Sequence, residues 1–211
     1  MTRRYDAVLF DLLTALLDSW TLWNAVAGDA ERGGAWRAAY LRITYRSGAY
    51  RPYEDLVAEA AAAVGLPRHL ADELNARYAE LRPWNDVSDV LSQLAGAGLP
   101  LGVVTNCSER LGRMAVAQTG VRFDVLVTAE RAGVYKPDPR AYLLALDDLG
   151  VAASRCLFVA GSAYDLVGTA AVGLPTYWHD RIGMTPPDGA PTPLAHHATL
   201  RPLLPLVGFG P

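Results

Sequence analysis

The chain has 211 residues, of which 51% are hydrophobic and 19% are charged, a composition typical of a globular protein and not of a disordered one. The formal net charge of -3 disfavours a nucleic-acid partner, because phosphate backbones attract basic surfaces. The sequence shows no apolar run long enough to span a membrane, no signal-peptide pattern and only two cysteines, so we expect a cytoplasmic protein without a membrane partner.

The first predicted strand ends on a carboxylate. Residues 5–10 form a short apolar run that stops at Asp11. This pattern predicts a buried strand that presents Asp11 at its carboxyl end. A carboxylate in that place is costly to bury unless a charged or hydrogen-bonding partner compensates it.

Lys136 is a candidate partner for Asp11. The nineteen basic residues are eighteen arginines and this one lysine. Chance is one explanation in a chain rich in arginine and alanine. The other is chemical, because a compact ammonium can insert between carboxylates where a planar guanidinium cannot.

The segment that follows the first strand, residues 16–82, contains no convincing strand. Its apolar spacing predicts helices over residues 20–30, 36–45, 53–64 and 67–82. Gly65 and Pro67 separate the last two of these helices. We therefore expect an all-helical insertion after the first strand.

From residue 83 onward, predicted helices and strands alternate. Strands are expected over residues 99–105, 123–128, 154–160 and 174–178, the last being the final strand of the chain. Helices are expected over residues 86–96, 109–119, 137–149 and 163–172, with a loop over 185–193 and a short helix over 200–206. Such alternation predicts an α/β fold of three layers, in which helices cover both faces of a parallel sheet.

Polar residues follow the predicted strands at their carboxyl ends. In open parallel sheets, ligands bind beyond these ends. Each residue alone also fits an ordinary role in a turn or helix cap, but their combination and order are unlike a chance arrangement. In chain order they are Asp11, Thr105 with Asn106, Lys136, Gly161 with Ser162, and Asp165.

These motifs resemble those of the haloacid dehalogenase (HAD) superfamily. The resemblance lies in residues 10–18, 103–106, 135–139 and 158–165, and their spacing matches over nearly the whole chain. Within the superfamily the chain is most similar to the L-2-haloacid dehalogenase branch, through Trp36-Arg37 and residues 53–56, 136–142 and 173–178. The resemblance implies a HAD-like Rossmannoid core formed by residues 1–15 and 83–211, with residues 16–82 as an inserted helical cap domain.

The resemblance also implies roles for individual residues. Asp11 would be the nucleophile that forms an ester of its own carboxylate, and Lys136 would keep it ionised. Thr105 would bind the negative group of the substrate, and Asp165 would orient Lys136 or position the hydrolytic water. Arg37 would reach from the cap to the leaving halide. Further substrate contacts are expected from Leu12, Leu13, Thr14, Asn106, Tyr142, Ser162 and Tyr164.

Two positions favour a dehalogenase over a phosphatase. The phosphatases of the superfamily have a general acid two residues after the nucleophile, where this chain has Leu13, and a magnesium-binding acid where it has Gly161. The resemblance therefore implies metal-independent hydrolysis of a small 2-haloacid, a carboxylate substrate, without a cofactor. A magnesium-dependent phosphatase, with Asp18 as the nearest spare acid, remains an alternative.

The chain also departs from the dehalogenase pattern. That branch usually has Tyr at the place of Leu13, and Ser-Ser-Asn at the place of residues 160–162. A third hypothesis is therefore that the chain is a divergent member of the superfamily, with another substrate or with only a binding role. Family members are often dimers, which makes a homodimer plausible. The pair His196-His197 fits a solvated turn better than a metal site.

Overall fold

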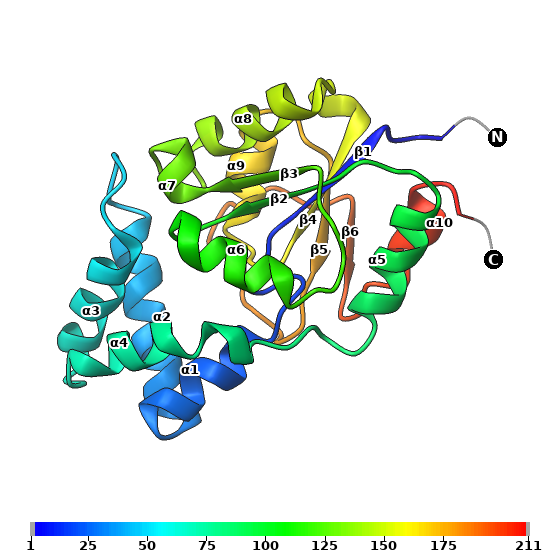
Figure 1. Cartoon of the computed structure of the whole chain (residues 1–211). Helices are drawn as coiled ribbons and strands as arrows, with labels where there is room; N and C mark the ends of the chain where they lie inside the picture. Colours follow the sequence, from blue (N-terminus) through cyan, green and yellow to red (C-terminus); the bar gives the residue numbers. More distant parts are fainter. Residues whose placement is uncertain (1–2, 210–211) are drawn as a thin grey trace.

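The structure is a computed structural model that describes residues 3–209. Its centre is a six-stranded parallel sheet with the strand order β3-β2-β1-β4-β5-β6 (Figure 1). The strands are β1 Ala7–Phe10, β2 Leu101–Thr105, β3 Val125–Thr128, β4 Cys156–Ala160, β5 Thr176–His179 and β6 Ala195–His197.

Strand β1 lies in the middle of the sheet, paired with β2 on one side and β4 on the other. Phe10 aligns with Val103 and with Val159, and all four residues of β1 are buried. The chain steps outward from β1 to β3 and then returns to β4, so the strand order reverses beside β1. Ligands bind at such reversal points, and Asp11 is the first residue beyond β1.

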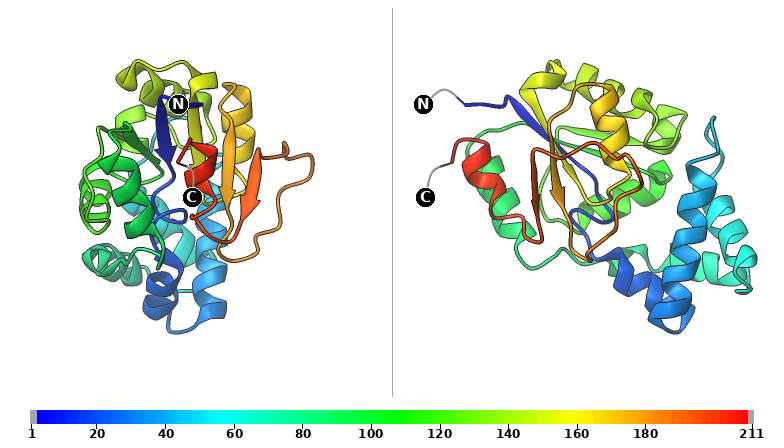
Figure 2. Two further views of the ribbon diagram at one scale, coloured as in Figure 1. Left: turned by 90° about the vertical axis from the view of Figure 1, so that its right-hand side faces the viewer. Right: turned by 180° about the vertical axis from the view of Figure 1, so that it is seen from behind.

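Helices cover both faces of the sheet, as Figure 2 shows from the edge. One set of helices packs its apolar side chains on one face of the sheet, and a second set of helices packs on the other face. The first set consists of α5 Val87–Gly96, α6 Glu109–Ala117 and α10 Leu203–Leu206, and the second of α8 Pro139–Leu149 and α9 Asp165–Ala171, with the short α7 Ala129–Ala132 after β3. The predicted three-layer α/β core is confirmed.

The segment between β1 and α5 is helical, as predicted. It contains α1 Ser19–Ala27, α2 Ala30–Thr44, α3 Tyr53–Ala63 and α4 His69–Ala76, followed by a 3-10 turn at Tyr78–Glu80. These helices lie together at the end toward which β1 runs (Figures 1 and 2). Leu17 and Pro83 form an isolated antiparallel bridge, so the segment leaves and re-enters the core at one place.

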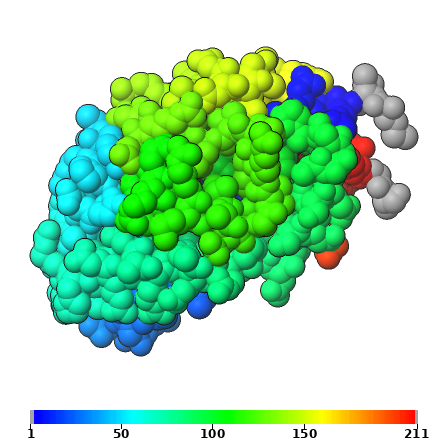
Figure 3. All heavy atoms as spheres, in the orientation of Figure 1, coloured from blue at the N-terminus to red at the C-terminus, as the bar shows by residue number. Residues whose placement is uncertain are grey.

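The helical segment has an aromatic interior of its own. Trp36 is fully buried, and its indole N–H donates to the carbonyl of Val57 at 2.9 Å. The rings of Trp23 and Trp36 lie 4.8 Å apart, and those of Tyr40 and Tyr53 lie 5.3 Å apart. On the face shown in Figure 3, the atoms of this segment abut those of α6.

The boundaries of two helices differ from the prediction. Helix α2 begins at Ala30 because the Asp29 side chain caps it by accepting from the backbone N–H of Arg32 at 2.8 Å. The predicted helix over residues 67–82 is shorter, since α4 ends at Ala76 and a 3-10 turn follows. Neither change moves a predicted site residue to another element.

The prediction that residues 174–178 form the final strand is wrong. Strand β6 follows and pairs in parallel with β5, with His196 opposite Trp178. The pair His196-His197 therefore lies in an edge strand and not in a turn. A three-residue edge strand that is partly exposed lacks the apolar run by which buried strands are recognised.

Candidate active site

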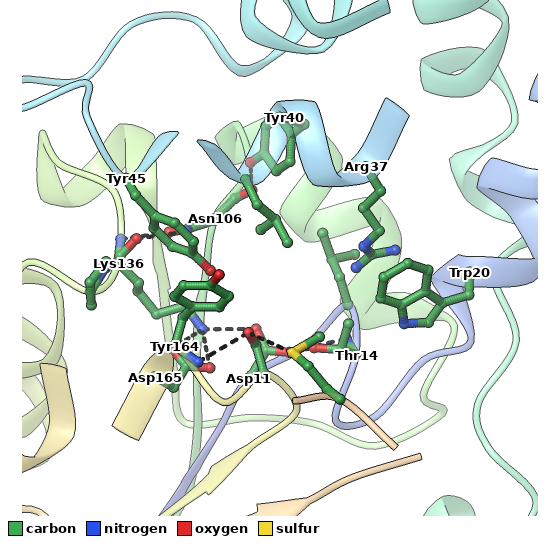
Figure 4. Close-up of a pocket in the computed structure, with 15 residues that line it drawn as sticks. Asp11, Thr14, Trp20, Arg37, Tyr40, Tyr45, Asn106, Lys136, Tyr164 and Asp165 are labelled. Carbon is green, nitrogen blue, oxygen red and sulfur yellow. Dashed lines mark hydrogen bonds and ion pairs between the residues drawn. The ribbon is translucent and has the colours of Figure 1, made fainter. Parts of the chain in front are cut away.

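A small cavity lies at the carboxyl ends of the strands, beneath helix α2. Its volume is about 50 Å³. Figure 4 shows Asp11, Lys136 and Asp165 at its base, with Arg37 and Trp20 on one side and Tyr45 with Tyr164 on the other. The lining consists of Asp11, Leu13, Thr14, Trp20, Arg37, Tyr40, Leu41, Tyr45, Asn106, Lys136, Pro137, Ser162, Tyr164, Asp165 and Met184.

The two oxygens of the Asp11 carboxylate have different environments. Oδ2 accepts three hydrogen bonds, from the Thr14 backbone N–H at 3.0 Å, the Thr14 hydroxyl at 2.5 Å and the Ala15 backbone N–H at 3.2 Å. Within the described residues, Oδ1 accepts only from the ammonium of Lys136, at 2.8 Å. Oδ2 is therefore fixed by the chain, whereas Oδ1 keeps lone-pair capacity for a reaction.

Lys136 bridges two carboxylates at the base of the cavity. Its ammonium lies 2.8 Å from Asp11 Oδ1 and 3.1 Å from Asp165 Oδ1, and the residue is only 4% exposed. The side chain of Asn106 holds the Lys136 backbone, accepting from its N–H at 2.7 Å and donating to its carbonyl at 3.0 Å. The hydroxyl of Tyr142 donates to Asp165 Oδ1 at 2.7 Å.

The charges of this cluster shift the pKa values of its members. Burial alone would raise the pKa of Asp11. The Lys136 ammonium and the Thr14 hydrogen bonds lower this pKa by more than burial raises it, so the net shift is downward. Burial raises the pKa of Asp165, and the Asp11 charge adds to this against the opposing effect of Lys136. Burial lowers the pKa of Lys136, but the two carboxylates raise it overall. Asp11 is therefore the carboxylate held ionised, and Asp165 is the one more readily protonated.

Arg37 is a buried cation without an acidic partner. It is 6% exposed, and no carboxylate of the described residues lies within ion-pair distance of its guanidinium. Its Nη1 donates to the Ser19 hydroxyl at 2.6 Å, and its guanidinium carbon lies 4.2 Å from the Trp20 ring centre. Burial lowers the pKa of Arg37, since the charged form is poorly solvated there. Such a charge is compensated when an anion enters the cavity.

The residues at the base of the cavity do not fit a magnesium ion of the kind that the related phosphatases use. Lys136 already neutralises the carboxylates of Asp11 and Asp165, and among the described residues no third His, Cys, Asp or Glu joins them in a group that could hold a metal. A side chain at Gly161 would place its Cβ 2.2 Å from the Ala15 nitrogen and 2.3 Å from the Thr14 hydroxyl. The loop that holds Asp11 therefore excludes an acid at position 161.

Nine of the twelve predicted site residues line the cavity, and three do not. Leu12 has its side chain in the core, although its backbone N–H donates to no acceptor of the described residues. Thr105 is buried and does not line the cavity, and its hydroxyl lies 3.8 Å from the Cys107 sulfur. Tyr142 lies behind Asp165, which it contacts. The side chains of Leu12, Thr105 and Tyr142 therefore do not face the cavity, and these residues can act on a ligand only through their backbone groups or through a neighbouring residue.

The structure adds lining residues that the motifs did not indicate. Leu41 lies one helical turn beyond Arg37, a spacing that places both on one face of α2. Met184 comes from the segment between β5 and β6, where no sequence pattern pointed to a site. Trp20, Tyr40 and Tyr45, three aromatic residues of the helical segment, also line the cavity.

The fold is a Rossmann-like α/β core, and the cavity places a buried carboxylate, that of Asp11, just beyond the central strand. A family model described as haloacid dehalogenase-like hydrolase matches residues 5–173. The chain belongs to this family.

Individual relatives agree with the family model. The chain is 34% identical to an (S)-2-haloacid dehalogenase of Pseudomonas sp. (strain YL), over 72% of this chain and 71% of that protein. It is 30% identical to (S)-2-haloacid dehalogenase 4A of Burkholderia cepacia, over 95% and 94%.

Solved structures show the same fold. A crystal structure of an L-2-haloacid dehalogenase, 29% identical, superposes with a TM-score of 0.84 and covers 96% of this chain and 98% of its own. The L-2-haloacid dehalogenase of Xanthobacter autotrophicus, 24% identical, gives a TM-score of 0.85 over 98% and 100%. In the described part of the chain, every helix is too short or too polar to cross a membrane.

Proposed function

We propose that this chain hydrolyses the carbon–halogen bond of a small 2-haloacid through an ester on Asp11. One relationship supports this most directly: a carboxylate oxygen with free lone pairs and an unpaired buried guanidinium line the same small cavity. The first provides a nucleophile, and the second provides a partner for the anion that leaves.

The reaction balances with the residues at hand. Asp11 Oδ1 attacks C2 of the substrate, and the halide leaves with the bonding electron pair toward Arg37. Water then attacks the carboxyl carbon of Asp11, the ester C–O bond to Asp11 breaks, and the 2-hydroxy acid is released. The proton of the attacking water passes to Asp165, whose raised pKa suits it as a base, and from there to the departing alkoxide, while the proton of the re-formed Asp11 carboxyl group is lost to solvent. Halide needs no protonation to leave, so Leu13 at the place of a general acid is compatible with this chemistry.

The size and donors of the cavity favour a small carboxylic acid. A water-sized group needs about 10–15 Å³ of cavity volume, so 50 Å³ corresponds to roughly three to five non-hydrogen atoms. The backbone N–H groups of Leu12 and Leu13 donate to no acceptor of the described residues and can bind the substrate carboxylate. This volume suits a haloacetate, which has five non-hydrogen atoms, and a 2-halopropionate exceeds it by one methyl group.

We also propose that residues 16–82 act as a cap domain on a core formed by residues 1–15 and 83–211, of which residues 1–2 and 210–211 lie outside the described part. The aromatic interior of the helical segment supports this division, as does the bridge between Leu17 and Pro83, where the chain leaves and re-enters the core. The cap would provide Arg37 and Tyr45 to the cavity.

Halide release tests the proposed function. Purified protein is incubated with bromoacetate and L-2-chloropropionate, and halide is measured with the Asp11→Asn variant as the control. Release by the wild type alone is expected. No halide from any 2-haloacid contradicts the proposal, and magnesium-dependent cleavage of an aryl phosphate would favour the phosphatase alternative instead.

A further inference from the structure

The segment between β5 and β6 closes one side of the cavity with Met184. Asp180, which follows β5, is buried, and its Oδ1 accepts from the Met184 backbone N–H at 2.9 Å. Its Oδ2 lies 3.1 Å from His196 Nε2 in β6. Asp180, at the start of this segment, therefore contacts both Met184 at the cavity and His196 in strand β6.

His196 is held in place from its other side as well. Its ring stacks on the Trp178 ring of the neighbouring strand, with centres 4.1 Å apart and planes 6° from parallel. The His196 ring therefore contacts both the Trp178 ring and the buried Asp180 carboxylate, and these contacts join the two ends of a segment that contains several prolines. Asp180 thus connects the Met184 backbone to His196 in β6.

Met184 lies at the apolar part of the cavity. Its sulfur is 3.6 Å from the Ser162 hydroxyl in the loop after β4, which also lines the cavity. The side chains of Met184, Leu13 and Leu41 cannot donate a hydrogen bond to a carboxylate, so they contact the carbon part of a ligand. An unbranched thioether side chain adapts to the group beside it, but it still occupies space that a longer ligand would need.

We infer that Met184 is a specificity-determining residue, which limits the length of the carbon chain on C2 of the acid, and that Asp180 and His196 position it. The inference deepens the proposed function, on which the identity of the ligand as a carboxylic acid rests. Removing the Met184 side chain would extend the cavity by several non-hydrogen atoms without changing Asp11, Lys136 or Arg37.

Binding of unreactive acids tests this without turnover. Dissociation constants of propionate and hexanoate are measured by calorimetry for the wild type, Met184→Ala and Met114→Ala. Met114 is a matched control, because it lies in α6 and does not line the cavity. One methylene in a fitted apolar pocket changes affinity on the order of 10-fold or more. Met184→Ala is therefore expected to shift the hexanoate-to-propionate ratio by at least about 10-fold toward hexanoate, with no shift in Met114→Ala.

His196→Phe tests the positioning role, since it retains an aromatic ring for Trp178 and removes the contact with Asp180. We expect the same direction of shift, but a smaller one. A ratio in Met184→Ala within about twofold of the wild type, or a wild type that binds neither acid, overturns the inference. Halide release is measured separately: a wild type that binds these acids but dehalogenates none contradicts the proposed function, while the binding ratio still decides the role of Met184.

Discussion

The ammonium of Lys136 lies 2.8 Å from Asp11 Oδ1 and 3.1 Å from Asp165 Oδ1, so one buried cation is shared by two carboxylates of opposite pKa shift. A compact ammonium fits between them, whereas a planar guanidinium needs more room and a different donor geometry. The chain uses arginine at every other basic position, and lysine only here.

Lys136→Arg is expected to lower kcat for bromoacetate on the order of 100-fold or more, because a misplaced donor no longer orients Asp11 Oδ1. Lys136→Met leaves two buried carboxylates without a counter-ion and is expected to lower the free energy of unfolding by about 3–5 kcal/mol. Arg140→Lys, at an exposed ion pair with Asp138, is the control. Wild-type kcat in Lys136→Arg would show that the bridge is not needed for turnover.

The pKa shifts of Asp11 and Asp165 predict that kcat/KM and kcat decrease at different pH values as the solution is made more acidic. Formation of the ester requires ionised Asp11, whose pKa is lowered, so kcat/KM should fall only below the ordinary carboxyl value of about 3.9. Hydrolysis of the ester requires Asp165 as a base, and its pKa is raised. When that step limits turnover, kcat should therefore begin to fall at a higher pH than kcat/KM.

The same shifts fix the sign of the pH effect on stability. The lowered pKa of Asp11 contributes stability that is present above the unfolded value and is lost as pH falls through the folded one. Asp165 acts in the opposite sense, because its raised pKa costs stability at neutral pH and the cost disappears as it is protonated. Rate profiles and unfolding midpoints over a pH series check both statements. Acid limbs of kcat and kcat/KM that coincide would contradict the separate roles.

Replacement of Arg37 by methionine is expected to change activity and stability in opposite directions. Arg37→Met removes an unpaired buried charge and keeps the volume of the stem, so the free energy of unfolding should be unchanged or higher by up to about 1–4 kcal/mol. Ser19 still donates to the Leu13 carbonyl and is not left unpaired. Halide release should be lost.

Arg42→Met is the matched control, because Arg42 is an exposed residue on the same helix. Added bromide should raise the melting temperature of the wild type and of Arg42→Met by binding the folded state, but not that of Arg37→Met. An equal bromide effect in all three proteins would place the anion elsewhere.

Gly161→Ala tests the close approach of the loop after β4 to the loop after β1. Its Cβ would collide with Thr14 and Ala15, the residues that hold Asp11 Oδ2. Overpacking of this kind costs about 1–3 kcal/mol, and the displaced donors should reduce kcat by roughly 10-fold or more. Gly34→Ala, in helix α2 with open space around it, should instead raise stability by up to about 1 kcal/mol. Wild-type kinetics in Gly161→Ala would show that the loops can separate without harm.

The sequence was most informative where periodicity and strand ends coincide. The alternation after residue 83 predicted the parallel sheet, and the segments that follow its strands contain Asp11, Lys136 and Asp165. Three-dimensional proximity could not be predicted in the same way. Thr105 precedes Asn106 at the same strand end, yet Thr105 is buried away from the cavity lining, whereas the Asn106 amide lines the cavity and holds the Lys136 backbone.

Short and irregular elements were also invisible to the pattern. Strand β6 has three residues and only an edge position, so its composition did not indicate a strand. Met184 reaches the cavity through the contacts of Asp180 with residues on either side, which a single sequence does not reveal. Both misses concern the part of the chain where tertiary contacts, and not local preference, determine the conformation.

Transfer of oxygen from water to Asp11 tests the central claim most directly. Excess enzyme is mixed with bromoacetate in ¹⁸O-labelled water for a single turnover, and both the glycolate and the peptide that contains Asp11 are analysed by mass spectrometry. Attack by Asp11 on the substrate, followed by water on the ester, predicts unlabelled glycolate and the label in Asp11. Labelled glycolate with an unlabelled Asp11 peptide would mean that water attacks the substrate itself, and would contradict the aspartyl ester.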